Sequence, residues 1–145
     1  MRLRFLSPLH KAIRQLSVYV EPRVESLGVG SEGHLLSYLR SYAPCPVGEL
    51  RRVFGIKRST LTSMLDRIEE KGFITRTAND DDRRSLLVSI TPGGRRVADR
   101  LEVVLHELEE EIQGRITARD LQGFDAVMAA IDDLTRVELR PQEDR

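Results

Sequence analysis

Polar side chains that could contact DNA are grouped along the segment after Gly55. They occur at helical spacing, so they share one face, and they are Arg58, Ser59, Thr62 and Ser63. A basic residue at the start of such a helix can contact phosphates, while short hydroxyl side chains can reach base edges in a major groove. The same face could also be ordinary solvated surface, so this pattern alone leaves both interpretations open.

Further along the chain, two β-type runs flank a strongly polar turn. The runs are FITRTA (73–78) and SLLVSI (85–90), and the turn is NDDDRR (79–84). Arg83 and Arg84 in this turn could reach a phosphate or enter a minor groove. Asp80, Asp81 and Asp82 could suggest a metal site, but three successive carboxylates in one turn cannot converge on one ion. No metal site is therefore predicted, and a solvated turn in which one Asp orients an Arg is favoured.

Two short amphipathic helices must position the polar face that starts at Arg58. The first, VGELRRVFG (47–55), carries apolar Leu50 and Phe54 and stops at Gly55. The second begins at about Lys57 or Arg58 and ends at Gly72, and its apolar stripe is Leu61, Met64, Leu65 and Ile68. Helix, turn, helix and hairpin is the layout of a winged DNA-binding module.

Helices are also predicted on both sides of this module. Apolar residues at helical spacing run over 9–27, and Ser31 is a candidate N-cap for the helix that follows. Thr91-Pro92 starts a helix that runs to about Gln113, and a capping box at Thr117 starts a last helix over 118–139. The outermost segments have apolar faces with little partner inside one protomer, which favours packing against a second copy.

Composition narrows the class of protein. The 145 residues fit one domain with extensions, no apolar run approaches the roughly 20 residues of a membrane span, and no secretory signal is evident. Cys45 is the single cysteine, which excludes an internal disulfide and favours a reducing cytoplasm. No nucleophile triad, P-loop or dinucleotide fingerprint is present, and the histidines are scattered, so we predict no enzyme, cofactor or metal.

A net charge of zero conceals an uneven distribution. Residues 40–96 carry 12 basic and 7 acidic side chains, whereas residues 97–145 carry 6 basic and 13 acidic ones. The basic excess falls on the candidate DNA-binding segment, where it would favour a polyanionic partner. A chance fluctuation in a charge-rich protein would give the same distribution.

The order LDRIEEKGFITR, then DDRRSLLVSI, then TPGG resembles the MarR family of bacterial and archaeal regulators, and the resemblance covers about residues 31–101. It implies a winged helix-turn-helix on an obligate homodimer that binds palindromic double-stranded DNA operators, usually as a repressor relieved by a small ligand or by oxidation. The residue pattern and the resemblance together predict this DNA-binding set: Lys57, Arg58, Ser59, Thr62, Ser63, Arg67, Asp82, Arg83 and Arg84. Asp82 would brace Arg84 for entry into the minor groove.

Two departures from the family pattern matter. Lys57 stands where the family usually has Ser, which removes a capping hydroxyl worth about 1 kcal/mol and adds a candidate phosphate contact. The reactive cysteine of the peroxide-sensing members has no counterpart near the N-terminus, and Cys45 lies elsewhere, in a proline-flanked loop. A redox-responsive regulator acting through Cys45 remains an alternative, as does a winged-helix protein–protein adaptor without specific DNA binding.

An aromatic or phenolic effector would lodge, by the same resemblance, between the dimer helices and the winged module. Tyr19, His34 and Tyr38 are candidate pocket residues, although each could equally be a packed core residue. The predicted fold class is mainly α with a small β-hairpin wing. The winged domain is assigned to residues 31–97 and the dimerisation helices to residues 1–30 and 98–145.

Overall fold

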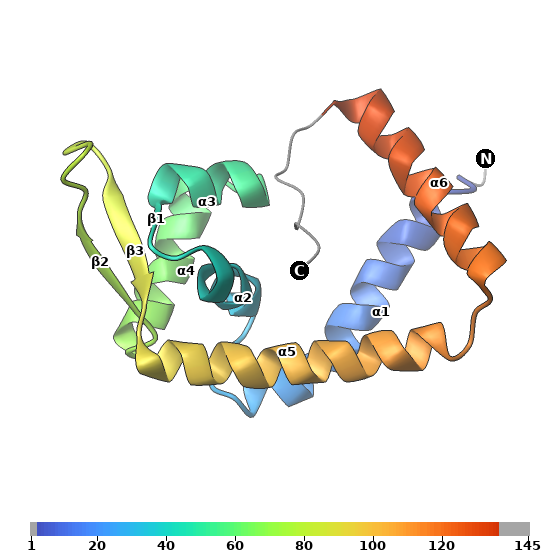
Figure 1. Ribbon diagram of the computed structural model, residues 1–145, viewed down its shortest axis with the longest axis horizontal. Helices are drawn as coiled ribbons and strands as arrows, with labels where there is room; N and C mark the ends of the chain where they lie inside the picture. Colours follow the sequence, from blue (N-terminus) through green and yellow to red (C-terminus); the bar gives the residue numbers. More distant parts are fainter. Residues whose placement is uncertain (1–2, 137–145) are drawn as a thin grey trace.

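A computed structural model describes residues 3–136, which form six helices and a small sheet. The elements are α1 (Leu6–Glu25), α2 (Gly33–Tyr42), β1 (Cys45–Pro46), α3 (Val47–Phe54), α4 (Arg58–Glu70), β2 (Ile74–Ala78), β3 (Leu86–Ile90), α5 (Pro92–Gln113) and α6 (Ala118–Thr135). Figure 1 shows α2, α3, α4 and the hairpin at one end of the long helix α5, and α6 at its other end. The predicted fold class is confirmed.

The sheet has one strand more than the hairpin. Its order is β1-β3-β2 with antiparallel pairing, and Cys45 lies opposite Val88. The proline-flanked segment around Cys45 was expected to be a loop, but Cys45 and Pro46 form a short edge strand. An edge position suits proline, because its missing N–H then costs no ladder hydrogen bond.

The winged module packs around a hydrophobic core to which Val24 of α1 and Ala98 and Leu101 of α5 also contribute. Within the module, apolar side chains that are at most 1% exposed include Leu35, Leu36, Leu39, Leu50, Leu61, Leu65, Ile68, Ile74 and Val88. The stripe predicted for residues 58–72 is thus confirmed as the inner face of α4. Gly55, with φ of 59°, ends α3 in the left-handed conformation expected of a glycine stop.

The outer helices, in contrast, leave their apolar faces uncovered. Ile13 on α1 is 61% exposed, and Phe124 and Leu134 on α6 are 56% and 84% exposed. No residue of α6 is buried, and α1 buries only Val24. The prediction that these faces find little partner inside one protomer is confirmed for the described residues; the last three predicted residues of the final helix, 137–139, lie outside them.

Three predicted helix starts can be compared with the structure. Thr91 Oγ1 accepts a hydrogen bond from the Gly94 N–H, and Thr117 with Asp120 forms the predicted capping box. Ser31 as the N-cap of α2 is wrong, because the N-cap residue is Glu32. The chain first makes a turn in which the Gly33 N–H donates to the Gly30 carbonyl, and this delays the helix.

The start of α5 lies unusually close to the turn between α4 and β2. The Phe73 carbonyl accepts from the Thr91 N–H at 3.0 Å, and the Thr91 hydroxyl donates to the Gly72 carbonyl at 2.6 Å. A Cβ built on Gly94 would lie only 2.0 Å from the Phe73 oxygen. We call these four residues (Gly72, Phe73, Thr91 and Gly94) the α5 junction. It fixes α5 to the winged module at a separation that only glycine allows at position 94.

Gly94→Ala should therefore lower the free energy of unfolding by about 3 kcal/mol, because backbone atoms rather than a flexible side chain must move aside. The measurement is the urea unfolding midpoint at fixed protein concentration. Gly93→Ala is the matched control, since its Cβ would meet no atom closer than 3.7 Å and alanine favours a helix. Equal midpoints for the two variants would contradict the close approach.

Candidate nucleic-acid interface

The polar face of α4 is exposed along its length and is ordered by local hydrogen bonds. Thr62 Oγ1 donates to the Arg58 carbonyl at 2.9 Å, and Ser63 Oγ donates to the Ser59 carbonyl at 3.1 Å. These bonds orient the hydroxyl groups while leaving their oxygens available as acceptors. Lys57 is the N-cap residue and makes no side-chain cap bond, so the expected loss of a capping hydroxyl is confirmed.

The wing turn, residues 79–85, is held by its own side chains. Asn79 is only 8% exposed, and its side chain donates to Ser85 Oγ and accepts from the Asp81 N–H, each at 3.1 Å. Asp82 Oδ1 accepts from the Arg84 N–H at 3.0 Å. Asp82 thus braces the backbone of Arg84, while the side chains of Arg83 and Arg84 are exposed. The sequence analysis missed Asn79, although asparagine at the start of a turn is a usual signal.

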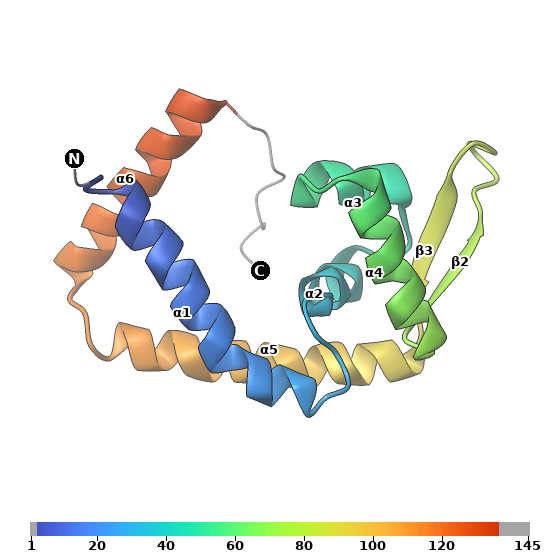
Figure 2. The same ribbon diagram turned by 180° about the vertical axis from the view of Figure 1, so that it is seen from behind.

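The start of α4 and the wing turn lie on the same side of the module. Figures 1 and 2 show the α3–α4 connection and the tip of the hairpin both directed away from α5. The C-terminal end of α4 instead points toward α5. The start of α4, with Lys57 and Arg58, and the wing turn, with Arg83 and Arg84, therefore both lie at the end of the module remote from α5. All four residues are exposed.

Arg67 lies apart from this surface. It is nine residues beyond Arg58, about 13 Å further along the helix axis toward α5. Its Nε donates to Glu32 Oε1 at 3.2 Å, and Lys71 Nζ lies 4.0 Å from the same oxygen. Burial alone would raise the pKa of Glu32, but hydrogen bonds from its own backbone and from Arg67, with the charges of Arg67 and Lys71, lower it overall. Glu32 is therefore a buried carboxylate, held charged by two cations of α4 and its C-cap.

Two arginines that the sequence analysis did not single out join the elements. Arg76 on β2 reaches Asp66 and Glu69 on α4, each at 2.5 Å. The sequence contains a signal for these pairs, because Asp66 and Glu69 lie three residues apart on one helix face and Arg76 follows just after the turn. Arg40 on α2 pairs with Asp99 and with Glu102 of α5, the latter at 2.8 Å. These pairs fix α4 to the sheet and α2 to α5.

The three candidate effector residues do not line one pocket. Tyr38 packs against Tyr42 and Phe54 with ring centroids 4.5 and 5.6 Å away, and its hydroxyl donates to Glu49. His34 is exposed on α2. Tyr19 lines a cavity.

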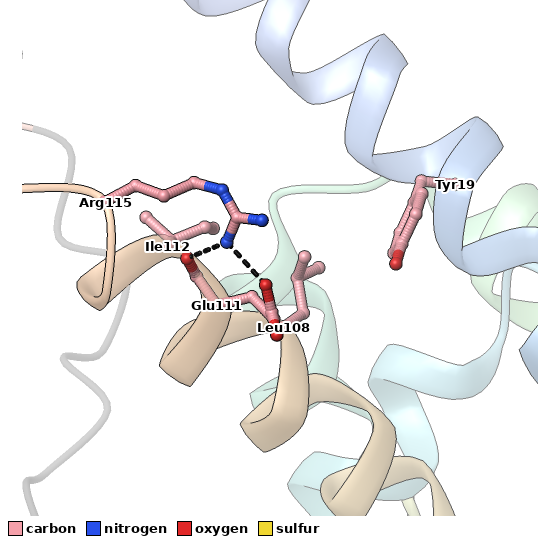
Figure 3. A pocket seen from close by; sticks show the side chains of 5 residues that line it. All are labelled: Tyr19, Leu108, Glu111, Ile112 and Arg115. Atoms are coloured by element: carbon pink, nitrogen blue, oxygen red, sulfur yellow. Dashed lines mark hydrogen bonds and ion pairs between the residues drawn. The ribbon is translucent and has the colours of Figure 1, made fainter.

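That cavity, of about 260 Å³, lies between α1 and the C-terminal part of α5. Figure 3 shows Tyr19 facing Leu108, Ile112 and Arg115, whose guanidinium is bonded to Glu111. Its wall is mainly apolar and open to solvent.

Cys45, candidate metal ligands and candidate membrane-spanning helices can be assessed within residues 3–136. Cys45 is 1% exposed in β1, so a small oxidant has little access to its sulfur. No three His, Cys, Asp or Glu side chains of this described part are placed to hold a metal ion. Nor does this part contain a helix with the length and apolar character needed to span a bilayer.

A family comparison matches the winged module. The MarR family model covers residues 31–86, which run from the start of α2 into β3. This part of the chain is similar in sequence to the MarR family. The members of this family are transcriptional regulators and not enzymes.

Two bacterial regulators are also similar to this chain in sequence. Over 99 residues the chain is 25% identical to the HTH-type transcriptional regulator YwhA of Bacillus subtilis, which covers 68% of this chain and 71% of YwhA. It is 30% identical over 84 residues to the multiple antibiotic resistance protein MarR of Escherichia coli, covering 57% of this chain and 58% of that protein. The match to E. coli MarR thus spans less than two thirds of the length of that protein.

Solved MarR-type structures extend the likeness to nearly the whole chain. A mutant of E. coli MarR complexed with operator DNA gives a TM-score of 0.76 at 25% identity and covers 87% of this chain and 92% of that one. The S. aureus MepR–DNA complex gives a TM-score of 0.83 over 90% of this chain and 97% of that one. At 14% identity, the second comparison shows the fold alone.

Proposed function

We propose that this protein is a homodimeric, sequence-specific DNA-binding regulator that acts as a repressor at palindromic operators in the cytoplasm. The observation that carries the proposal is that the start of α4 and the wing turn both lie at the end of the module remote from α5, and that their basic residues are exposed. A helix in the major groove with a basic hairpin beside it matches the needs of duplex DNA. Two of the similar structures, S. aureus MepR and the E. coli MarR mutant, are complexes with DNA.

In this proposal the predicted contacts have separate tasks. Lys57 and Arg58 neutralise phosphates at the start of α4, and the hydroxyl side chains of Ser59, Thr62 and Ser63 face base edges. Arg83 and Arg84 reach the backbone or the minor groove from the wing turn, whose shape Asp82 supports. Arg67 has weaker support as a DNA contact, because it is already paired with Glu32.

The dimer is proposed from the uncovered apolar faces of α1 and α6. We assign residues 1–30 and 98–145 to dimerisation and residues 31–97 to DNA binding. Apolar faces of this size are rarely left in water by a protein of one copy. A two-fold pairing would place two winged modules about one helical turn of DNA apart, so that each binds one half of a palindrome.

We also propose that a small aromatic or phenolic effector relieves the repression. The cavity beside Tyr19 offers an apolar wall and the Arg115 guanidinium, which suit a ring that carries an anionic or hydroxyl group. Its volume of about 260 Å³ is below the range of roughly 300–1,000 Å³ usual for ligand pockets. A second protomer would supply the missing walls. A redox mechanism has less support, because Cys45 is buried.

Arg84→Ala should weaken operator binding at least tenfold, because each protomer loses a cation at the DNA surface. The affinity is measured by gel shift on DNA upstream of the protein's own gene, with the dimer verified by sedimentation. Arg119→Ala removes the same charge from exposed α6 and serves as the matched control. Unchanged binding by the Arg84 variant would reject the wing assignment, and no specific shift by the wild type would favour a protein–protein adaptor.

Phe124→Glu should dissociate the dimer, because two copies of a 56% exposed ring would otherwise be buried together. Burial of each ring contributes about 1.5–3 kcal/mol, so association should weaken roughly a hundredfold or more. Sedimentation equilibrium measures the change. Gln122→Glu adds the same charge to an exposed position of α6 and should leave the dimer intact. A Phe124 variant that associates as strongly as the wild type would rule out this face as the interface.

A further inference from the structure

A buried carboxylate joins the link between α1 and α2 to the end of α4. The side chain of Glu32 is 4% exposed, whereas those of Arg67 and Lys71 are 49% and 42% exposed. These three residues, the Glu32 cluster, connect positions 35 to 39 residues apart in the sequence. A charged side chain buried to this degree is rare unless it is paired, and breaking such a pair from one side costs several kcal/mol.

The surroundings of the carboxylate restrict the link closely. A Cβ on Gly30 would lie 3.2 Å from the second carboxylate oxygen, and the neighbouring Val29 is 2% exposed in the core. The link therefore cannot shift without moving a core residue or exposing the carboxylate. The cluster thus joins the chain segment that follows α1, which carries an uncovered apolar face, to the C-terminal end of α4, whose first residues are at the proposed DNA surface.

We propose that Glu32 is a positioning residue that fixes the orientation of α4 relative to α1, and thereby the distance between the two DNA-binding helices of a dimer. This inference rests on the proposed function. It assigns Arg67 to an intramolecular ion pair with Glu32 rather than to a phosphate, although the sequence predicted a DNA contact there. It also makes the spacing between operator half-sites, rather than base recognition, the property that Glu32 controls.

Overall charge and the positioning role predict opposite changes in the DNA affinity of the Glu32→Gln variant. Removing a negative charge from a DNA-binding protein should strengthen its binding if only the overall field matters. If Glu32 positions α4, the variant should bind about tenfold more weakly at the spacing that the wild type prefers. It should also discriminate less between operators whose half-sites are one or two base pairs nearer or farther apart.

The experiment measures the affinity of the full chain for palindromes selected by the wild type from random-sequence DNA, over a series of half-site spacings. Glu70→Gln is the matched control, because it removes the same charge from an exposed position of α4 and should not weaken binding. Arg67→Gln should reproduce the spacing defect, and the double variant should bind no more weakly than either single one, as expected for partners in one interaction.

Two results would overturn the inference. One is a folded Glu32→Gln protein that binds as tightly as the wild type with the same spacing preference. The other is an Arg67→Gln protein that binds more weakly at every spacing with a salt slope lower by about 1 per protomer, which is the mark of a lost phosphate contact. If Glu32→Gln does not fold, the Arg67 variant decides alone. A wild type that selects no DNA overturns the proposed function, and the inference with it.

Discussion

The α5 junction is the contact on which the rest of the structure depends. With no side chain at Gly94, the first turn of α5 can lie against the Phe73 carbonyl, and Thr91 bonds both to that carbonyl and to Gly72. The turn after α4, the end of β3 and the start of α5 thus meet at one point. Since α5 has 22 residues and is about 33 Å long, its direction there decides where α6 lies.

Buried residues are concentrated in the winged module, while the outer helices α1 and α6 together bury only Val24. The leucines of α2 and α4 are removed from water inside a single protomer, whereas α6 has no buried residue at all. Ion pairs of Arg40 with Asp99 and Glu102 hold the module to α5. This division fits a protein in which DNA contacts are preorganised by each protomer and the assembly is completed by its partner.

Much of the fold could be predicted because local chemistry determines it. Thr91 and the Thr117–Asp120 box start helices through backbone bonds within one turn, and the stripe of α4 follows from 3.6-residue periodicity. Ser31 was assigned wrongly because the turn at Gly30 decides where α2 starts.

Features that depend on distant partners were beyond the sequence. Pro46 as an edge strand requires β3, and the pairing of Glu32 with Arg67 requires the packed module. The residue types of the candidate DNA surface were predictable, but its common orientation away from α5 was visible only in three dimensions. The candidate effector residues illustrate the same limit, since Tyr38 packs with Tyr42 while Tyr19 lines a separate cavity.

The central claim is that two copies of the winged module contact one duplex, each with α4 in a major groove and its wing at the flanking minor groove. A hydroxyl-radical footprint of the wild-type protein on DNA that it selects tests this most directly. The account predicts two symmetric protected zones with centres about one helical turn, 10–10.5 base pairs, apart, and weaker protection on both outer sides from the wings. A single protected zone, or no protection on any selected sequence, would contradict it.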